Sequence, residues 1–136
     1  MSKSFEINLK VSFYDLDPMR VVWHGNYLKY FDKARFALFD NYGIDLYKYL
    51  KTKQYVFPIT RSNVKHIAPL QYNDKFVCKA TVTEAKYKIV TDFEIHLANN
   101  GTLCARARSE QLAVKFPEME MQFEIPFEIR KALGFN

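Results

Sequence analysis

The sequence is poor in cysteine: Cys78 and Cys104 are the only two among 136 residues, and each falls within an apolar, strand-like segment. No Cys-x-x-Cys pair or Cys/His ligand spacing is present, which favours reduced, buried thiols over a metal site. No run approaches about 18 uninterrupted apolar residues, and the start resembles no signal peptide. We therefore expect a cytoplasmic protein without a membrane span, a metal or a cofactor.

A dominant charge of one sign is also missing. The formal net charge is +5, and residues 48–75 account for this surplus with six Lys or Arg against one acidic residue. No strand face combines clustered Lys/Arg with interleaved aromatic residues, which argues against a nucleic-acid-binding protein. A modest basic region instead suits a phosphorylated ligand or an acidic protein partner, and solvated surface explains many such regions.

Apolar residues, by contrast, are plentiful. They make up 49% of the chain, including 9 Tyr and 12 Phe, enough for a substantial core, a subunit interface or an apolar ligand pocket. The sequence has no internal repeats, linkers or low-complexity tracts. The length and composition predict a single domain over residues 1–136.

Two periodicities organise the first third of the chain. Residues 5–14 alternate apolar and polar side chains, which predicts a strand with one buried face. Pro18 ends that pattern. Residues 26–42 carry apolar side chains at helical spacing and on the flanks as well, which predicts a largely enclosed helix. Gly25 or Asn26 can cap its start, and Gly43 suits the left-handed position after its end.

The remainder reads as a short helix and four strands. The helix is expected over 46–53, the strands over 56–67, 75–85, 87–98 and 103–116, and a helical turn near 126–133. Asn99-Asn100-Gly101 predicts a hairpin turn, and a change of parity in the last strand predicts a bulge near 109–111. The fold class is thus α+β, an antiparallel sheet of about five strands curled around one long helix.

Acidic residues and a histidine lie immediately before the long helix. Asp15 and Asp17 precede it and His24 stands at its start. A helix start presents unpaired backbone N–H groups and the positive end of the helix dipole, which can stabilise an oxyanion. A carboxylate facing that point could attack a carbonyl or activate a water. From the residues alone, an Asp-x-Asp-Pro segment before a helix is more often an ordinary turn with Asp side chains bonded to nearby N–H groups.

Residues 13–35, Phe-Tyr-Asp-Leu-Asp-Pro-Met-Arg-Val-Val-Trp-His-Gly-Asn-Tyr-Leu-Lys-Tyr-Phe-Asp-Lys-Ala-Arg, closely resemble the signature of the hotdog-fold 4-hydroxybenzoyl-CoA thioesterase family, including its Tol–Pal-associated acyl-CoA thioesterase branch. Residues 69–74, Pro-Leu-Gln-Tyr-Asn-Asp, resemble a second family motif. The resemblance implies a hotdog fold, hydrolysis of an acyl- or aroyl-CoA or acyl-carrier-protein thioester, and a homodimer or a dimer of dimers (a homotetramer) with active sites at the subunit interface.

The same resemblance implies roles for individual residues. Asp17 would be the catalytic nucleophile or general base. His24 would supply a backbone N–H to the thioester oxygen, with a separate role for its ring. The expected substrate-binding residues are Phe13, Arg20, Trp23, Gly25, Asn26, Tyr27, Lys86 and Lys88, of which the two lysines would contact the nucleotide.

This chain departs from the family pattern at two positions. Arg20 replaces the usual glycine, so either the turn adopts a backbone compatible with a side chain or Arg20 reaches into the site, where it would favour ionised Asp17. Phe13 replaces a tyrosine that assists catalysis in one branch, so we expect it to shape an apolar acyl pocket instead. Two alternatives stay open: a non-catalytic module that binds acyl thioesters, and an enzyme acting only on carrier-linked chains. A hotdog dehydratase is disfavoured because its His-Phe-Pro-type motif is not visible.

Overall fold

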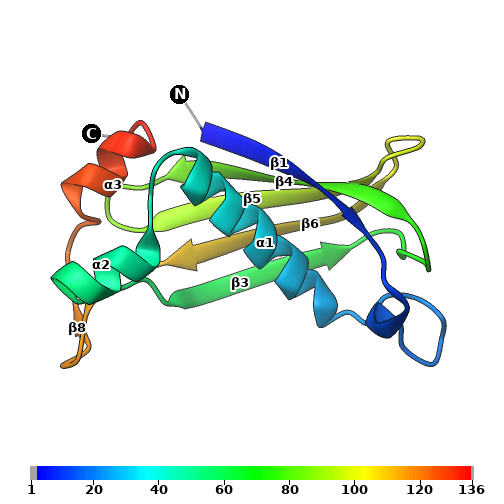
Figure 1. Cartoon of the computed structure of the whole chain (residues 1–136), viewed down its shortest axis with the longest axis horizontal. Coiled ribbons are helices and arrows are strands. Elements are labelled where there is room, and N and C mark those ends of the chain that lie inside the picture. The colour runs from blue at the N-terminus through cyan, green and yellow to red at the C-terminus, as the bar shows by residue number, and fades with distance from the viewer. Residues whose placement is uncertain (1–2, 136) are drawn as a thin grey trace.

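The computed structural model describes residues 3–135 and contains one long helix lying across a five-stranded antiparallel sheet (Figure 1). The strand order is β1-β4-β5-β6-β3. The elements are β1 (Lys3–Lys10), α1 (Asn26–Asn41), β3 (Ile59–His66), β4 (Lys75–Glu84), β5 (Ile89–Leu97) and β6 (Leu103–Gln111). This arrangement confirms the predicted α+β class and its hotdog architecture, with β1 and β3 as the two edges of the sheet.

A strand forms where the sequence predicted the first one, but it ends four residues before the predicted end at Tyr14. In β1 the alternation of half-buried and exposed side chains holds from Phe5 to Lys10, where pairing with β4 ends. The chain then turns into a one-turn 3₁₀ helix, η1 (Phe13–Asp15). Phe13 and Tyr14 are therefore in a turn, and the strand predicted through Tyr14 is wrong at its end because this turn takes over the backbone.

The central helix α1 follows the prediction closely, spanning Asn26–Asn41 against a predicted 26–42. Gly25 precedes it as the N-cap, and Gly43 follows it with φ 74°, the left-handed backbone that glycine adopts without penalty. Its buried face packs on the sheet. Enclosure is incomplete, since Leu28 and Phe36 remain half-exposed.

The last predicted strand, 103–116, is two strands in two sheets. β6 ends at Gln111, and the chain resumes as β7 (Val114–Lys115) in a separate three-stranded sheet with β2 (Tyr55–Val56) and β8 (Glu120–Met121). The β3–β6 pairing shifts register between Ile59 and Arg61, opposite Gln111 and Glu110, so the irregularity predicted near 109–111 is present. The change of sheet after Gln111 accompanies the shift in parity. The short helices α2 (Leu46–Lys53) and α3 (Phe127–Ala132) agree with the predicted positions.

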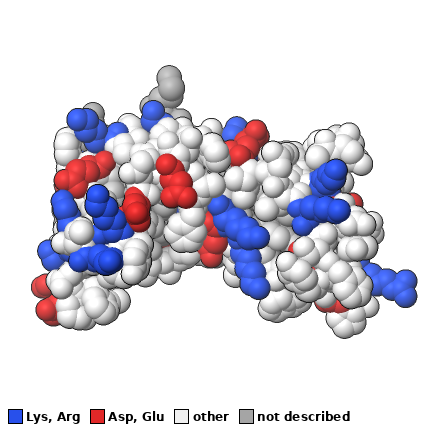
Figure 2. Space-filling model, viewed as in Figure 1, with Lys and Arg blue, Asp and Glu red and all other residues white. Residues whose placement is uncertain are grey.

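The core lies between α1 and the sheet, where side chains such as Phe39, Phe76 and Phe93 are fully buried. No helix among residues 3–135 is long and apolar enough to cross a membrane. The basic residues predicted as one region are dispersed: Lys51 and Lys53 lie at the end of α2, where Figure 2 shows basic side chains gathered, whereas Arg61 and Lys65 lie on β3.

Candidate active site

The segment before α1 is fixed to the helix by two hydrogen bonds to one carbonyl. The Asp15 carbonyl oxygen accepts from the Trp23 N–H at 3.0 Å and from the Asn26 side-chain amide at 2.9 Å. A bridge between Leu16 and Val22 closes the loop between them. Asn26 is buried, so its amide orients the loop against the first turn of the helix, and residues 15–26 form one compact unit.

The Asp15 carboxylate reinforces this unit. One of its oxygens, Oδ2, accepts from the Ser12 N–H at 3.0 Å and from the Tyr30 hydroxyl at 2.9 Å. Burial and the hydrogen bond to Asp15 raise the pKa of Tyr30, so that the hydroxyl stays protonated and donates. Asp15 is therefore a positioning residue that joins η1 to the second turn of α1, and not a free base.

Residues 69–74, the second motif, lie against this loop. The Val22 N–H donates to the Leu70 carbonyl at 2.9 Å, and Gln71 forms a bridge with Val21. The Leu70 N–H donates to the Tyr27 hydroxyl at 3.4 Å. Two sequence motifs about 45 residues apart are thus parts of one structure, a contact that the sequence resemblance did not specify.

Asp17 sits at the tip of the loop and is only half-buried. Its Oδ1 accepts from the Met19 N–H at 2.8 Å, and its carbonyl accepts from the Arg20 N–H at 2.9 Å. Within residues 3–135, Oδ2 of Asp17 has no hydrogen-bond donor, and no ion pair joins the carboxylate to a cation. The carboxylate therefore closes the turn with one oxygen and leaves the other available to react.

The start of α1 offers backbone donors next to this loop. The N–H groups of His24 and Gly25 have no hydrogen-bond acceptor within the described residues, as expected where a helix begins. The His24 side chain is exposed, with its ring 5.2 Å from that of Trp23. Two free N–H groups at the positive end of a 16-residue helix can accept a developing negative charge.

Trp23 covers Gly25 closely. A Cβ atom on Gly25 would lie 2.3 Å from Cζ3 and 2.4 Å from Cη2 of the indole, although the indole itself is 49% exposed. The absence of a side chain at Gly25 thus serves contact with Trp23 in this structure, whereas the sequence suggested close approach of a ligand. Substrate binding by Trp23, Gly25, Asn26 and Tyr27 stays a prediction.

Arg20 has a left-handed backbone. Its φ is 66°, in the region that costs a non-glycine residue on the order of 1 kcal/mol. Hydrogen bonds from the Met19 and Arg20 N–H groups to Asp17 fix the turn, and this conformation accommodates the side chain at that cost. The Arg20 side chain is exposed and forms no ion pair with Asp17 in the described chain.

The alternation suggested that Phe13 lies on the buried face of a strand, but the structure places it elsewhere. It is 74% exposed and contacts Tyr72 edge-on, with ring centroids 5.9 Å apart. Among the described residues, it does not line the apolar cavities that Leu28, Phe31 and Phe36 form beside α1. A place in the acyl pocket therefore stays a prediction that needs a partner subunit or a bound substrate to bring other groups against it.

Lys86 and Lys88 lie far from Asp17 in the same chain. They occupy the connection after β4, a ten-residue strand whose first residues adjoin the loop, so about 30 Å separates them from it. Lys88 is engaged with Glu110 at 3.2 Å, and the Lys86 ammonium lies over the Tyr87 ring. Any role for these lysines in substrate binding therefore concerns the site of another subunit.

A cavity of about 180 Å³ opens between α1 and the strands β3, β5 and β6, starting at Leu28 in the first turn of the helix. Leu28, Phe31, Ile59 and Phe93 give it apolar walls. At its far end stands Arg35, which is 3% exposed. A larger apolar groove of about 500 Å³ continues past Arg35 towards α2.

Arg35 is the functional candidate that sequence reasoning missed. It donates to Ser109 Oγ at 2.7 Å and pairs with Asp32, and its guanidinium lies over the Phe93 ring. Its Nε has no hydrogen-bond partner among residues 3–135. Burial lowers the pKa of the guanidinium, which the Asp32 carboxylate opposes. Only the Ala34-Arg35 pair of the signature hinted at it, and its contact with Ser109, 74 residues away in the sequence, depends on the fold.

The chain is similar to known proteins in sequence and in fold. A family model described as the thioesterase-like superfamily matches residues 11–133. A 1,4-dihydroxy-2-naphthoyl-CoA hydrolase of Synechocystis is 22% identical over 85% of this chain and 84% of its own length. A chloroplastic acyl-acyl carrier protein thioesterase of Arabidopsis thaliana is 28% identical over 88% of this chain, which spans about half (54%) of that protein.

A solved structure of a 4-hydroxybenzoyl-CoA thioesterase mutant complexed with 4-hydroxybenzoyl-CoA superimposes with a TM-score of 0.88, covering 97% of this chain and 99% of that one at 19% identity. At this identity the likeness establishes the fold.

Proposed function

The chain belongs to the thioesterase-like superfamily, and on that basis we propose that it hydrolyses an acyl- or aroyl-CoA thioester to the free acid and the thiol. The observation that carries the proposal is the pairing of a carboxylate that has one unengaged oxygen, Asp17, with two free backbone N–H groups at the start of α1. Relatives acting on 1,4-dihydroxy-2-naphthoyl-CoA and on acyl carrier protein esters support the substrate class.

In this proposal the thioester carbonyl oxygen accepts from the N–H groups of His24 and Gly25. The Asp17 carboxylate attacks the carbonyl carbon or removes a proton from a water that attacks it. The C–S bond breaks and the thiolate leaves, taking a proton from protonated Asp17 on the general-base route or from solvent on the nucleophilic route. On the nucleophilic route, water then hydrolyses the acyl-Asp17 anhydride to the free acid and regenerates the carboxylate. Loss of one oxyanion donor typically costs about 3 kcal/mol of transition-state stabilisation, which is comparable with the factor of about 10²–10⁴ that a general base contributes. A role for the His24 ring is a separate proposal.

The cavity behind the helix entrance supports binding of the acyl group. Its volume of about 180 Å³ suits a ring or a short chain, with Leu28 and Phe31 as contacts. A longer chain would have to pass Arg35 to reach the apolar groove beyond. We therefore propose aromatic or short acyl groups as substrates.

We also propose that the protein works as a homodimer formed through the free edge of β3. This strand pairs only with β6 among the described elements, and all but one of its residues are exposed. Leu28 and Ile59, which flank the seam between α1 and β3, are 49% and 46% exposed. A second copy pairing there would satisfy the unpaired strand edge and cover both side chains. A dimer of dimers would use a further surface.

A substrate panel tests the activity. The protein is incubated with benzoyl-CoA, a short fatty acyl-CoA, a long fatty acyl-CoA and an acyl carrier protein ester, and thiol release is followed. Release from the first two confirms the proposal. Release from the carrier ester alone would transfer the assignment to carrier-linked substrates, and binding without release would indicate a non-catalytic module.

Sedimentation equilibrium tests the dimer. We expect twice the chain mass of 16.1 kDa for the wild type, and one chain mass after Ile59→Lys, which places a charge on the edge strand at a side chain that is 46% exposed. An active wild-type monomer would contradict the interface.

A further inference from the structure

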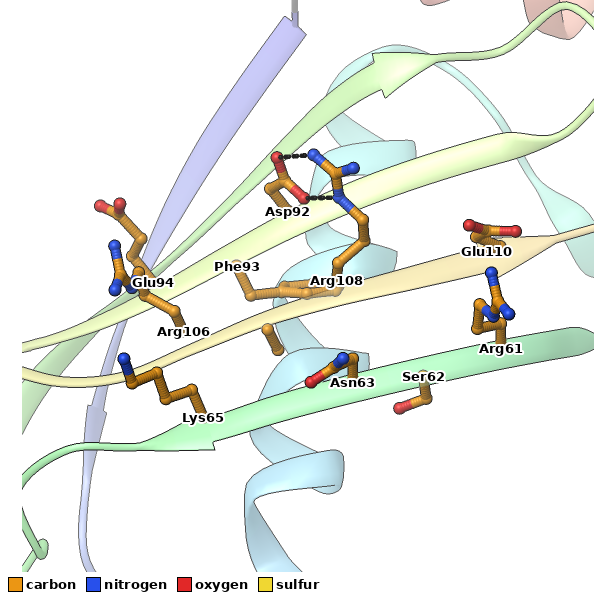
Figure 3. A pocket seen from close by; sticks show the side chains of 11 residues that line it. Arg61, Ser62, Asn63, Lys65, Asp92, Phe93, Glu94, Arg106, Arg108 and Glu110 are labelled. Carbon is orange, nitrogen blue, oxygen red and sulfur yellow. Dashed lines mark hydrogen bonds and ion pairs between the residues drawn. The ribbon is translucent and has the colours of Figure 1, made fainter.

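The outer face of the sheet, turned away from α1, carries a shallow cavity of about 750 Å³ over β3, β5 and β6 (Figure 3). Strand alternation puts charged side chains on this face. They are Arg61 and Lys65 on β3, Asp92 and Glu94 on β5, and Arg106, Arg108 and Glu110 on β6. Cations outnumber carboxylates there, although the neighbouring inner face is apolar.

Some of these charges neutralise one another. Arg108 forms two hydrogen bonds with Asp92, at 2.7 and 3.1 Å, and Glu110 pairs with Lys88 at 3.2 Å. Among residues 3–135, Lys65 and Arg106 have no carboxylate oxygen within 4.0 Å. Both lie at the same end of the cavity (Figure 3).

Lys65 and Arg106 are direct cross-strand partners in the β3–β6 ladder. Like charges placed opposite each other on one face of a sheet destabilise it. Glu94 stands opposite Arg106 on the other side, but it is also opposite Lys79 and lies 3.9 Å from the His96 ring, so one carboxylate has several basic neighbours. The pair therefore retains excess positive charge that an anionic ligand would compensate.

The position of this pair relates it to the candidate active site. β3 ends at His66, whose ring packs edge-on against Tyr27, the second residue of α1, with centroids 4.7 Å apart. Lys65 is the preceding residue and points to the opposite face of the strand. The pair thus lies across the end of β3 from the helix entrance, whereas Lys86 and Lys88 lie at the far end of the sheet.

We propose that Lys65 and Arg106 bind a phosphate group of the nucleotide end of coenzyme A while the thioester lies at the start of α1. This inference rests on the proposed thioester hydrolysis and adds a subsite to it. The extended pantetheine arm crosses the end of β3, and the guanidinium and the ammonium each donate hydrogen bonds to phosphate oxygens. Because the contact is remote from the reacting carbonyl, it affects binding and leaves the chemical step unchanged.

The test compares Lys65→Gln/Arg106→Gln with a matched control, Lys10→Gln/Lys75→Gln. Lys10 and Lys75 are also like charges directly opposite each other, but in the β1–β4 ladder and outside this cavity. Binding of free coenzyme A is measured by calorimetry at about 0.1 M salt, and KM and kcat are measured for one acyl group on coenzyme A and on pantetheine. Pantetheine lacks the nucleotide and reports on the rest of the site.

We expect the Lys65/Arg106 variant to bind coenzyme A about 10-fold more weakly than the wild type does, and its KM for the CoA ester to be higher to a similar extent. The kcat for the CoA ester, and both KM and kcat for the pantetheine ester, should be unchanged. The control should stay within about 2-fold of wild type, since its charges are more than a Debye length of about 10 Å away along the sheet. Glu94→Gln should act in the opposite direction and tighten binding about 2-fold, because a carboxylate beside the phosphate is removed.

Equal losses in the Lys65/Arg106 variant and in the control would overturn the proposal, as would an equal rise in KM for the pantetheine ester. A loss seen with an acyl carrier protein ester and not with coenzyme A would assign the surface to the carrier and also overturn it. If the wild type hydrolyses no thioester, the proposed function fails, while the calorimetric comparison still decides whether this pair binds the nucleotide.

Discussion

Gly25→Ala isolates the contact between Trp23 and the start of α1. The backbone at Gly25 has φ −65° and ψ −25°, which alanine adopts without strain, so any effect must come from the added methyl group. That methyl carbon would meet Cζ3 of Trp23 at 2.3 Å, whereas carbon atoms pack at about 3.5–4.0 Å. The indole must therefore move by more than about 1 Å.

The cost of this movement can be bounded. A Trp side chain buries about 150–250 Å² when enclosed, and this one is 49% exposed, so roughly 100 Å² of apolar contact is at stake. At about 25 cal/mol per Å² the upper limit is about 2.5 kcal/mol. Because the exposed ring can settle elsewhere on the surface, we expect a loss of about 1 kcal/mol in the free energy of unfolding.

Trp23 is the single tryptophan, so its fluorescence reports on this contact alone. The emission maximum should shift towards longer wavelength in Gly25→Ala as the ring becomes more exposed, while urea unfolding followed by circular dichroism gives the stability. In a Trp23→Ala background the same glycine substitution should be nearly neutral, which makes the pair a double-mutant cycle. Unchanged emission together with unchanged stability would refute the contact.

Two further predictions concern the supports of the site. Tyr30→Phe removes the hydroxyl that donates to Asp15, which should lower the free energy of unfolding by about 1–2 kcal/mol and reduce turnover, whereas Tyr42→Phe, with its 3.3 Å contact near the other end of α1, should change neither. Burial raises the pKa of the Cys78 thiol to about 12 from its ordinary value near 9. Its contribution to the free energy of unfolding should therefore be complete below about pH 9 and decline by about 1 kcal/mol per pH unit above it. Urea midpoints measured across about pH 8–10.5 should fall less steeply for Cys78→Ala than for the wild type, and equal slopes for the two proteins would contradict this.

The regular elements were predictable because their periodicities reflect local burial. The helix over 26–41 and the helix over 46–53 lie within a residue of their predicted bounds, since apolar spacing and glycine positions decide both. The end of β1 was not predictable in this way. Alternation continues formally through Phe13, but the hydrogen bond from Ser12 to Asp15 takes the backbone into a turn.

For the candidate site, the sequence named residues such as Asp17 and His24, whose catalytic roles stay predictions, but it did not show their contacts. The approach of residues 69–74 and the buried position of Arg35 depend on pairing between distant segments. The second sheet was missed for the same reason, because strands of two residues carry no periodicity that a sequence pattern can show.

The central claim is that the Asp17 carboxylate takes part in the reaction. Asp17→Asn tests it directly, because the Asn side-chain oxygen can still accept from the Met19 N–H and preserve the turn while the negative charge is lost. The measurement is kcat/KM for the best thioester of the panel, by thiol release, with circular dichroism to verify the fold. We predict a loss of at least about 100-fold in kcat/KM with an unchanged unfolding midpoint. A folded Asp17→Asn variant with wild-type turnover would contradict the account and leave Asp17 as a residue of the turn alone.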